Sequence, residues 1–470
     1  MLPTISTGNV ASALAGEYEV ANSLRFDDGS SDTLTRTFGS SGNKKTFTFS
    51  GWYKRSETGV EHRIFSSHNT GSPSGYASMH FHTSDDLIIF NYNGSSTFQY
   101  LRTDRKFRDL SAWYHIVLAY DTTQSTASNR VKLYINGVEE TSFSSETTPS
   151  QNADLYFNDN VIHYVSGGDP ANGSNPYSGY MAEIVLVDGQ QLDPTSFGEF
   201  DEDSPNIWKP KDVSGLTFGT NGFYLDFENA SSLGADVSGN GNNFTVNNLT
   251  SEDQTTDTCT NNYATGNPLA YTSTLSEGNL KLTGSVSYET MLSTIAVDSG
   301  KWYAEAKADT HSSVTLVGII ENEQWTTEAS GYHITGDQSL SFAYANDGRL
   351  VNAGDTPSWG STYTTGDIIG VYLDLDNSKL YFAKNGTIQN SGTGISLTSG
   401  KLYHIAITNR TSDFTSLNFG NPISSISSGN TDANGYGNFE YDPSDGGSAS
   451  FDSTAKDFYA LNSKNLAEFG

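Results

Sequence analysis

The chain has 470 residues, with 25 Lys and Arg against 54 Asp and Glu, which gives a net charge of −29 at pH 7. So acidic a chain, without a basic run, would repel phosphate groups, which argues against nucleic acid and anionic membrane surfaces as partners. Its longest apolar runs, such as 184–187, fall far short of the ~18 residues that span a bilayer, so no membrane insertion is expected. The single cysteine, Cys259, excludes intrachain disulfides and thiolate zinc clusters.

The first block of patterned sequence covers residues 18–198, after an N-terminal segment, 1–17, that shows no secretion signal. In residues 46–53, Phe47 and Phe49 alternate with threonine and serine, which is typical of a half-buried strand. Many short runs of this kind, separated by Gly, Asn and Asp, predict an all-β protein built as a sandwich. An Asn-Gly pair at 136–137 predicts a tight hairpin turn.

A connector is predicted over residues 199–274, where Pro, Gly and Asp interrupt the strand pattern. It opens with Glu199, Asp201, Glu202 and Asp203, the nearest approach to the paired carboxylates of a glycosidase. The cluster runs directly into Ser204-Pro205, which favours a solvated acidic turn over a catalytic strand. We therefore predict no catalytic residues and no enzyme.

A second sandwich is predicted over residues 275–422, with another Asn-Gly hairpin turn at 385–386. The final segment, 423–470, is first rich in Gly, Ser and Asp and then carries the apolar residues Phe458, Tyr459 and Leu461. Apolar residues in such a segment predict that it docks on another surface.

Both blocks resemble known domain families. FTFSGWYKR (47–55), WYHIVLAYD (113–121), VKLYINGV (131–138) and GYMAEIVLVDGQQL (179–192) resemble the laminin-G and pentraxin group of concanavalin A-like domains. SGKWYAEAK (299–307), GDIIGVYLDLDNSKLYFAKNG (366–386) and LNFGNPI (417–423) resemble a SPRY domain. The resemblance implies two jelly-roll-like β-sandwiches that serve chiefly in binding.

The combination, together with DFYALNSKNLAEFG (457–470), is similar to structural proteins of tailed phages, particularly marine ones. That resemblance implies a non-enzymatic virion protein, a tail or head fibre or another appendage, assembled in the host cytoplasm and acting outside it. Its expected partners are other virion proteins and a host-surface glycan or protein, and a homotrimer is expected. Two alternatives remain: a capsid or neck decoration protein without a receptor, and a polysaccharide depolymerase.

Candidate ligand-binding residues lie in polar loops of the second block. Trp325, Tyr332 and Trp359 offer aromatic faces for stacking on a sugar, and Asn346 and Asp347 offer hydrogen bonds to its hydroxyls. By contrast, the tryptophans of alternating strands are expected in the cores: Trp52, Trp113 and Trp302.

No cofactor and no metal centre are predicted from motifs. The laminin-G resemblance leaves structural calcium as an option, with candidate ligands Asp27, Asp28, Asp121 and Asp188, although such residues commonly form turns. His80 and His82 share one face of a predicted strand at zinc-like spacing, but no second motif supplies a third ligand.

Overall fold

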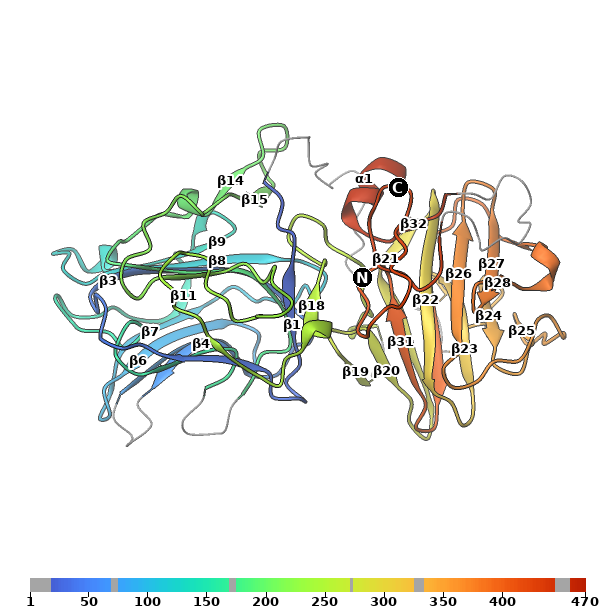
Figure 1. The fold of residues 1–470 in the computed structure, drawn as a ribbon, viewed down its shortest axis with the longest axis horizontal. Helices are drawn as coiled ribbons and strands as arrows, with labels where there is room; N and C mark the ends of the chain where they lie inside the picture. The colour runs from blue at the N-terminus through green and yellow to red at the C-terminus, as the bar shows by residue number, and fades with distance from the viewer. Residues whose placement is uncertain (1–17, 69–74, 169–174, 271–273, 325–333, 444–456) are drawn as a thin grey trace. The chain divides into compact units, whose positions relative to one another are not determined.

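The structure is a computed structural model and describes residues 18–68, 75–168, 175–270, 274–324, 334–443 and 457–470. These residues divide into two compact units, 18–260 and 261–470. Strands dominate both units, which confirms the all-β prediction (Figure 1). Among the described residues, no helix has the length and apolar character needed to cross a membrane.

Two stacked antiparallel sheets form the first unit. Sheet A runs in the order β10 (Val138–Glu139), β9 (Val131–Ile135), β8 (Tyr114–Asp121), β3 (Thr46–Arg55), β13 (Gly179–Asp188), β1 (Ser23–Phe26) and β18 (Gln254–Thr255), with β16 (Phe223–Leu225) also on β13. Sheet B runs in the order β11 (Phe143–Thr147), β7 (Thr97–Thr103), β6 (Leu87–Tyr92), β5 (Tyr76–Phe81), β4 (His62–His68), β12 (Ile162–Val165), β2 (Thr33–Thr37) and β17 (Thr245–Asn247). A separate hairpin joins β14 (Gly198–Phe200) to β15 (Trp208–Pro210).

Alternation in the strands builds the core between sheets A and B. Phe47, Phe49 and Tyr53 of β3 point into this core, where the Phe49 ring stacks on Phe65 of β4 at 4.2 Å. The intervening residues, Ser50 and Trp52 among them, must then face the other side of sheet A. The Asn-Gly turn is also present, because Asn136 and Gly137 both have positive φ, 49° and 78°.

A bulge in β13 changes which residues face the core. The register with β3 shifts between Ala182 and Val185, and Glu183 has a φ of 54°. One extra residue reverses the alternation beyond it. Ile184 therefore enters the core, and Val185 packs on the outer face.

The segment after residue 198 folds back onto the first unit. Phe197, Val213, Phe218 and Tyr224 pack with Val117, Val185 and Val187 on the outer face of sheet A. The compact unit accordingly extends to residue 260, whereas the sequence pattern placed a connector at 199–274. The sequence does not reveal that this segment covers sheet A, because a covering segment needs only scattered apolar residues and therefore shows no periodic pattern.

The second unit is also a sandwich of two sheets. Sheet C runs in the order β19 (Thr274–Ser276), β20 (Lys281–Thr283), β31 (Phe414–Asn418), β22 (Lys301–Thr310), β26 (Ile368–Asp374), β27 (Lys379–Lys384) and β28 (Thr387–Ile388), with β29 (Ile395–Ser396) on β27 and β32 (Tyr459–Ala460) on β22. Sheet D runs in the order β21 (Tyr288–Val297), β30 (Tyr403–Arg410), β23 (Thr315–Glu321), β24 (Ser341–Ala345) and β25 (Leu350–Val351). Helix α1 (Ser463–Phe469) follows β32. Short 3-10 turns occur at Ala127–Asn129, Pro194–Ser196, Ser251–Asp253 and Asn390–Gly392.

The C-terminal segment packs against its own unit. Tyr303, Tyr372 and Tyr381 stand opposite one another on three neighbouring strands of sheet C, and their outer face is covered by Phe439 and Phe458. The apolar residues of this segment thus find their docking surface within the same unit.

The two ends of the second unit meet. The backbone N–H of Ser463 donates to the carbonyl oxygen of Asn262 at 2.9 Å, and the N–H of Asn262 donates to the Ser463 hydroxyl at 2.9 Å. Asp432, which is buried, accepts hydrogen bonds from Ala460 N–H at 2.9 Å and from the Asn465 side chain at 2.7 Å. Together these contacts close the unit with a polar clasp.

Candidate ligand-binding groove

A groove of about 480 Å³ opens on the outer face of sheet A, within the size range of ligand pockets in proteins. Trp52, Trp113 and Trp208 line it, and the β9–β10 turn and the β14–β15 hairpin add to its walls. Its walls are therefore built by a strand of sheet A together with the segment that folds back after residue 198.

An aromatic stack supports the groove. The His115 ring stacks on Trp52 at 4.7 Å between centroids and also lies nearly parallel to Trp208 at 6.0 Å. Trp208 Nε1 donates a hydrogen bond to Nδ1 of His115 at 3.0 Å, and Nε2 of His115 lies 2.8 Å from the Ser50 hydroxyl. The stack is thus held both by ring contacts and by polar contacts.

The protonation state of His115 follows from these contacts. An indole N–H can only donate, so Nδ1 must accept and Nε2 carries the ring proton. Burial lowers the pKa of His115 to about 3, so the ring stays neutral at physiological pH. The groove therefore keeps one arrangement of donors and acceptors over a wide pH range.

Two glycines let the backbone approach Trp208 closely. A Cβ on Gly137, whose φ is 78°, would lie 2.3 Å from the Trp208 ring, and one on Gly198 would lie 2.6 Å from it. Any side chain at these positions would displace the indole from the stack.

The rim of the groove offers exposed apolar and polar groups. Phe200 is 43% exposed and meets Trp208 edge to face at 4.9 Å, and Val138 is 56% exposed. Asn206 is exposed at the same groove, and Arg105 is held by an ion pair of 2.6 Å with Glu140. Apolar walls with a few polar groups at the edge suit a ligand that has both apolar and hydroxyl-bearing faces.

Of the loop residues predicted for ligand binding, the structure describes Asn346, Asp347 and Trp359, and the N–H of Trp359 donates to the carbonyl oxygen of Gly348, which brings Trp359 beside the 346–348 turn. Trp359 packs edge to face on Tyr344 at 5.4 Å and on Phe382 at 5.7 Å, beside the second core. The Asn346 side chain contacts His311 at 2.9 Å, and Asp347 accepts from Nε of Arg349 at 2.7 Å. Trp325 and Tyr332 lie outside the described residues.

Most candidate calcium ligands have local structural contacts. Asp27 accepts from Gly29 N–H at 2.8 Å, and Asp121 from Thr123 N–H at 3.0 Å. Asp188 accepts from Asn43 N–H at 2.7 Å and from the Asn158 side chain at 2.6 Å. Asp28 differs, because its carboxylate lies near Glu57 and His62.

The acidic cluster after residue 198 forms a turn, in line with the sequence interpretation. Asp201 accepts hydrogen bonds from the N–H groups of Asp203 at 3.0 Å and Ser204 at 2.7 Å. Glu199 lies on β14 and is half exposed, 3.9 Å from Lys209.

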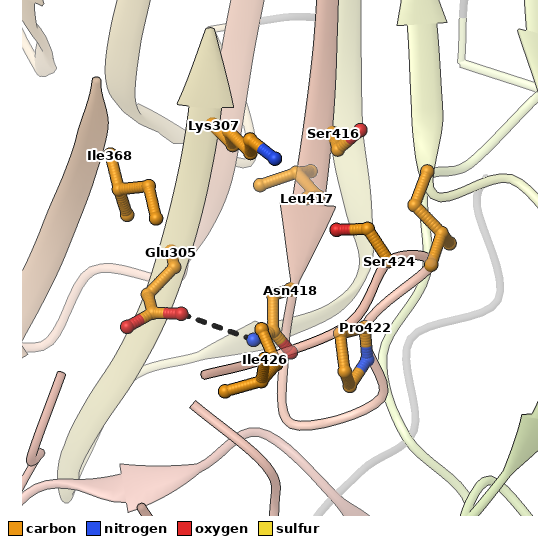
Figure 2. A pocket seen from close by; sticks show the side chains of 10 residues that line it. Glu305, Lys307, Ile368, Ser416, Leu417, Asn418, Pro422, Ser424 and Ile426 are labelled. Atoms are coloured by element: carbon orange, nitrogen blue, oxygen red, sulfur yellow. Dashed lines mark hydrogen bonds between the residues drawn. The ribbon is translucent and has the colours of Figure 1, made fainter. Parts of the chain in front are cut away.

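A small cavity in the second unit is too confined for an organic ligand. It measures about 20 Å³, roughly the space of one water molecule, and lies between β22, β31 and residues 422–426 (Figure 2). Its buried Glu305 accepts from Asn418 at 3.1 Å and from the N–H groups of Glu440 and Tyr441. Burial raises the pKa of Glu305, whose role is to fasten the C-terminal segment to sheet C.

The groove tryptophans were not among the predicted binding residues. Trp52 and Trp113 are buried, 3% and 9% exposed, but they lie on the outer face of sheet A and not in the core between the sheets. Trp302 does lie in a core, as predicted. The alternation of β3 could have indicated this position. Trp52 lies an even number of residues from Thr48 and Ser50, so it faces the same side of the strand as these polar residues.

Family comparison agrees with this architecture. Residues 27–192 match the family model described as the concanavalin A-like lectin/glucanases superfamily, and residues 301–421 match the SPRY domain model. The chain contains a concanavalin A-like domain and a SPRY domain. Both kinds of domain are compatible with binding carbohydrate or protein. Trp52 and Trp113 of the groove lie within the residues that match the concanavalin A-like model, whereas Phe200 and Trp208 follow them in the chain.

Individual proteins are similar over parts of the chain. The ATP-dependent RNA helicase DDX1 of Xenopus laevis is 31% identical over 94 residues, which is 20% of this chain and 12% of the helicase. The solved SPRY domain of human HERC1 is 20% identical, covers 32% of this chain and 96% of its own, and has a TM-score of 0.27. A heptameric SAP-like pentraxin from Limulus polyphemus is 14% identical, covers 37% of this chain and 79% of its own, and has a TM-score of 0.28.

Proposed function

We propose that the protein is a non-enzymatic binding protein whose concanavalin A-like domain holds a saccharide in the aromatic groove. The observation that carries the proposal is the groove itself, where three tryptophans and the exposed Phe200 surround a volume of about 480 Å³. The apolar C–H face of a sugar ring can lie against such rings, while its hydroxyl groups reach Asn206 and Arg105 at the edge.

Rigidity supports this assignment. Trp208 is held by the His115 hydrogen bond and by two glycine backbones, so its position is set before any ligand arrives. A preformed groove avoids the loss of side-chain freedom that weakens binding by flexible surfaces.

We further propose that the protein acts on a virion, as a tail or head appendage that attaches to a glycan on the host surface. The proposal rests on the resemblance drawn from the sequence motifs, and the strongly acidic composition, which keeps particles from associating, is consistent with it. Other virion proteins and two further copies of the chain are the proposed partners.

Saccharide binding is tested with an oligosaccharide array, followed by titration of each hit while tryptophan fluorescence is recorded. Three groove tryptophans should report binding as a shift in emission. We expect Phe200→Ala to weaken binding about fivefold or more, because an aromatic side chain that anchors a ligand contributes more than about 1 kcal/mol.

A matched pair of valines provides the control. Val138→Ala removes an exposed apolar side chain from the groove rim, whereas Val237→Ala removes one of similar exposure, 47%, elsewhere in the same unit. Only the Val138 variant should lower the affinity. Equal affinities for wild type, V138A and F200A would contradict the groove assignment, and release of reducing ends from a bound polysaccharide would contradict the non-enzymatic role.

A further inference from the structure

Three ligating side chains from separate segments converge at one edge of the first unit. Asp28 lies in the turn between β1 and β2, Glu57 in the turn between β3 and β4, and His62 at the start of β4. Their ligand atoms lie within 4.8 Å of one another. Nε2 of His62 is 2.9 Å from a carboxylate oxygen of Glu57, so the two atoms are close enough to contact one ion.

His62 is fully buried, and the part of the chain that the structure describes offers its ring no hydrogen bond. Its exposed fraction is 0%, and neither ring nitrogen makes a hydrogen bond, because the close approach of Glu57 does not have hydrogen-bond geometry. On another side, the ring meets the edge of Tyr177 at 6.0 Å between centroids. A buried polar group without a partner is costly, so this imidazole, aimed at two carboxylates, calls for a ligand that accepts its lone pair.

Charge at the cluster points to a cation. The carboxylates of Asp28 and Glu57 lie within 4.8 Å of each other, so their negative charges repel. Within the described residues, Arg63 is the nearby cation along β4, and it is paired with Glu61 at 3.0 Å. A divalent ion would neutralise both carboxylates at once.

Hydrogen bonds within the turn that carries Asp28 hold its backbone in place. Asp32 accepts from the N–H of Asp27 at 2.9 Å, and the N–H of Ser31 donates to the carbonyl oxygen of Asp28 at 3.1 Å. The Asp28 side chain is thereby presented to Glu57 and His62 by a braced backbone.

We propose that Asp28, Glu57 and His62 bind a divalent transition-metal ion, with Zn²⁺ as its representative. One imidazole nitrogen and two carboxylates form a donor set that zinc accepts, whereas Ca²⁺ takes six to eight oxygen ligands and has little affinity for imidazole. Three protein ligands leave a coordination position for water or for an external oxygen donor. This site is independent of the aromatic groove.

The test is calorimetric titration of the chelator-treated full-length protein with ZnCl₂, repeated with CaCl₂. We expect one Zn²⁺ per chain that is lost or weakened at least about tenfold in Asp28→Asn, Glu57→Gln and His62→Gln, because each removes one of three ligands. Asp154→Asn is the control, since it removes a carboxylate that is 60% exposed and lies outside the cluster.

Folding of each variant is checked by circular dichroism, and the two acid variants keep the test valid if His62→Gln does not fold. Zinc should also raise the melting temperature of the wild type more than that of D28N or E57Q, because it binds only the folded chain. Absence of zinc binding, or equal zinc affinity in wild type, D28N and E57Q, would overturn the proposal. So would tight Ca²⁺ binding that persists in His62→Gln, which would identify an oxygen-only site.

Discussion

Replacing Asp257 with alanine should lower the free energy of unfolding of the first unit by about 3–5 kcal/mol. Its carboxylate lies 2.7 Å from Nζ of Lys54, and the two side chains are 0% and 1% exposed. Trp113 Nε1 also donates to Asp257, at 3.4 Å. The substitution would leave the Lys54 ammonium buried without its carboxylate, which is far more costly than the loss of a surface pair.

The measurement is urea unfolding, with calorimetry to assign the transition to the first unit. Glu139→Gln serves as the control, because its pair with Lys132 is partly exposed, 39% and 25%, and should change stability by less than about 1 kcal/mol. Substitution of both partners, Lys54→Met with Asp257→Leu, should recover much of the loss. A D257A variant as stable as E139Q would show that the buried pair contributes little.

Glu183→Gln should stabilise the first unit at alkaline pH and remove part of its pH dependence. Burial raises the pKa of Glu183 to about 7, although the hydroxyls of Tyr18 and Tyr224 donate to its carboxylate at 2.9 and 2.8 Å. Because the folded-state pKa lies above that of the unfolded chain, the stabilising contribution is complete below about pH 4.5 and is lost as the pH rises through 7.

The size of this loss is about 3 kcal/mol, from the difference between the two pKa values. The stability of E183Q minus that of wild type should therefore grow by about this amount between pH 4.5 and pH 8.5, as measured by urea unfolding at each pH. Comparing the two proteins cancels the titration of the other acids in this strongly acidic chain. A difference that stays constant with pH would mean that Glu183 has the same pKa in the folded and the unfolded chain.

Local patterns predicted the strands and turns well, because each depends on neighbouring residues. The alternation of Phe47 and Phe49 placed β3 correctly, and the Asn-Gly pair at 385–386 forms the predicted turn, with φ values of 47° and 73°. The β13 bulge was not predictable, because Glu183 has no signature that distinguishes it from any other strand residue. The bulge nevertheless turns Ile184 into the core between the sheets and Val185 onto the outer face of sheet A.

Functional positions were harder to predict, because they depend on contacts between distant segments. Trp208 reaches the groove only because residues 199–260 fold back over sheet A, and its partner His115 lies 93 residues away in the sequence. Of the histidines, the sequence singled out His80 and His82 for their spacing, without predicting a metal site there, and gave no sign of His62. What distinguishes His62 is its position beside Asp28 and Glu57, which only the fold reveals.

The clasp between residues 262 and 463 has a consequence for how the second unit folds. Its partners are separated by 201 residues, so the entropy of closing a very long loop must be overcome before the clasp contributes any stability. Sheet C is also completed by β32, which pairs with β22 across more than 150 residues of chain. Such high contact order predicts slow folding, with the tyrosine row of sheet C uncovered until the clasp forms. During that interval, the uncovered tyrosine row is an apolar surface through which the unit can associate with other chains.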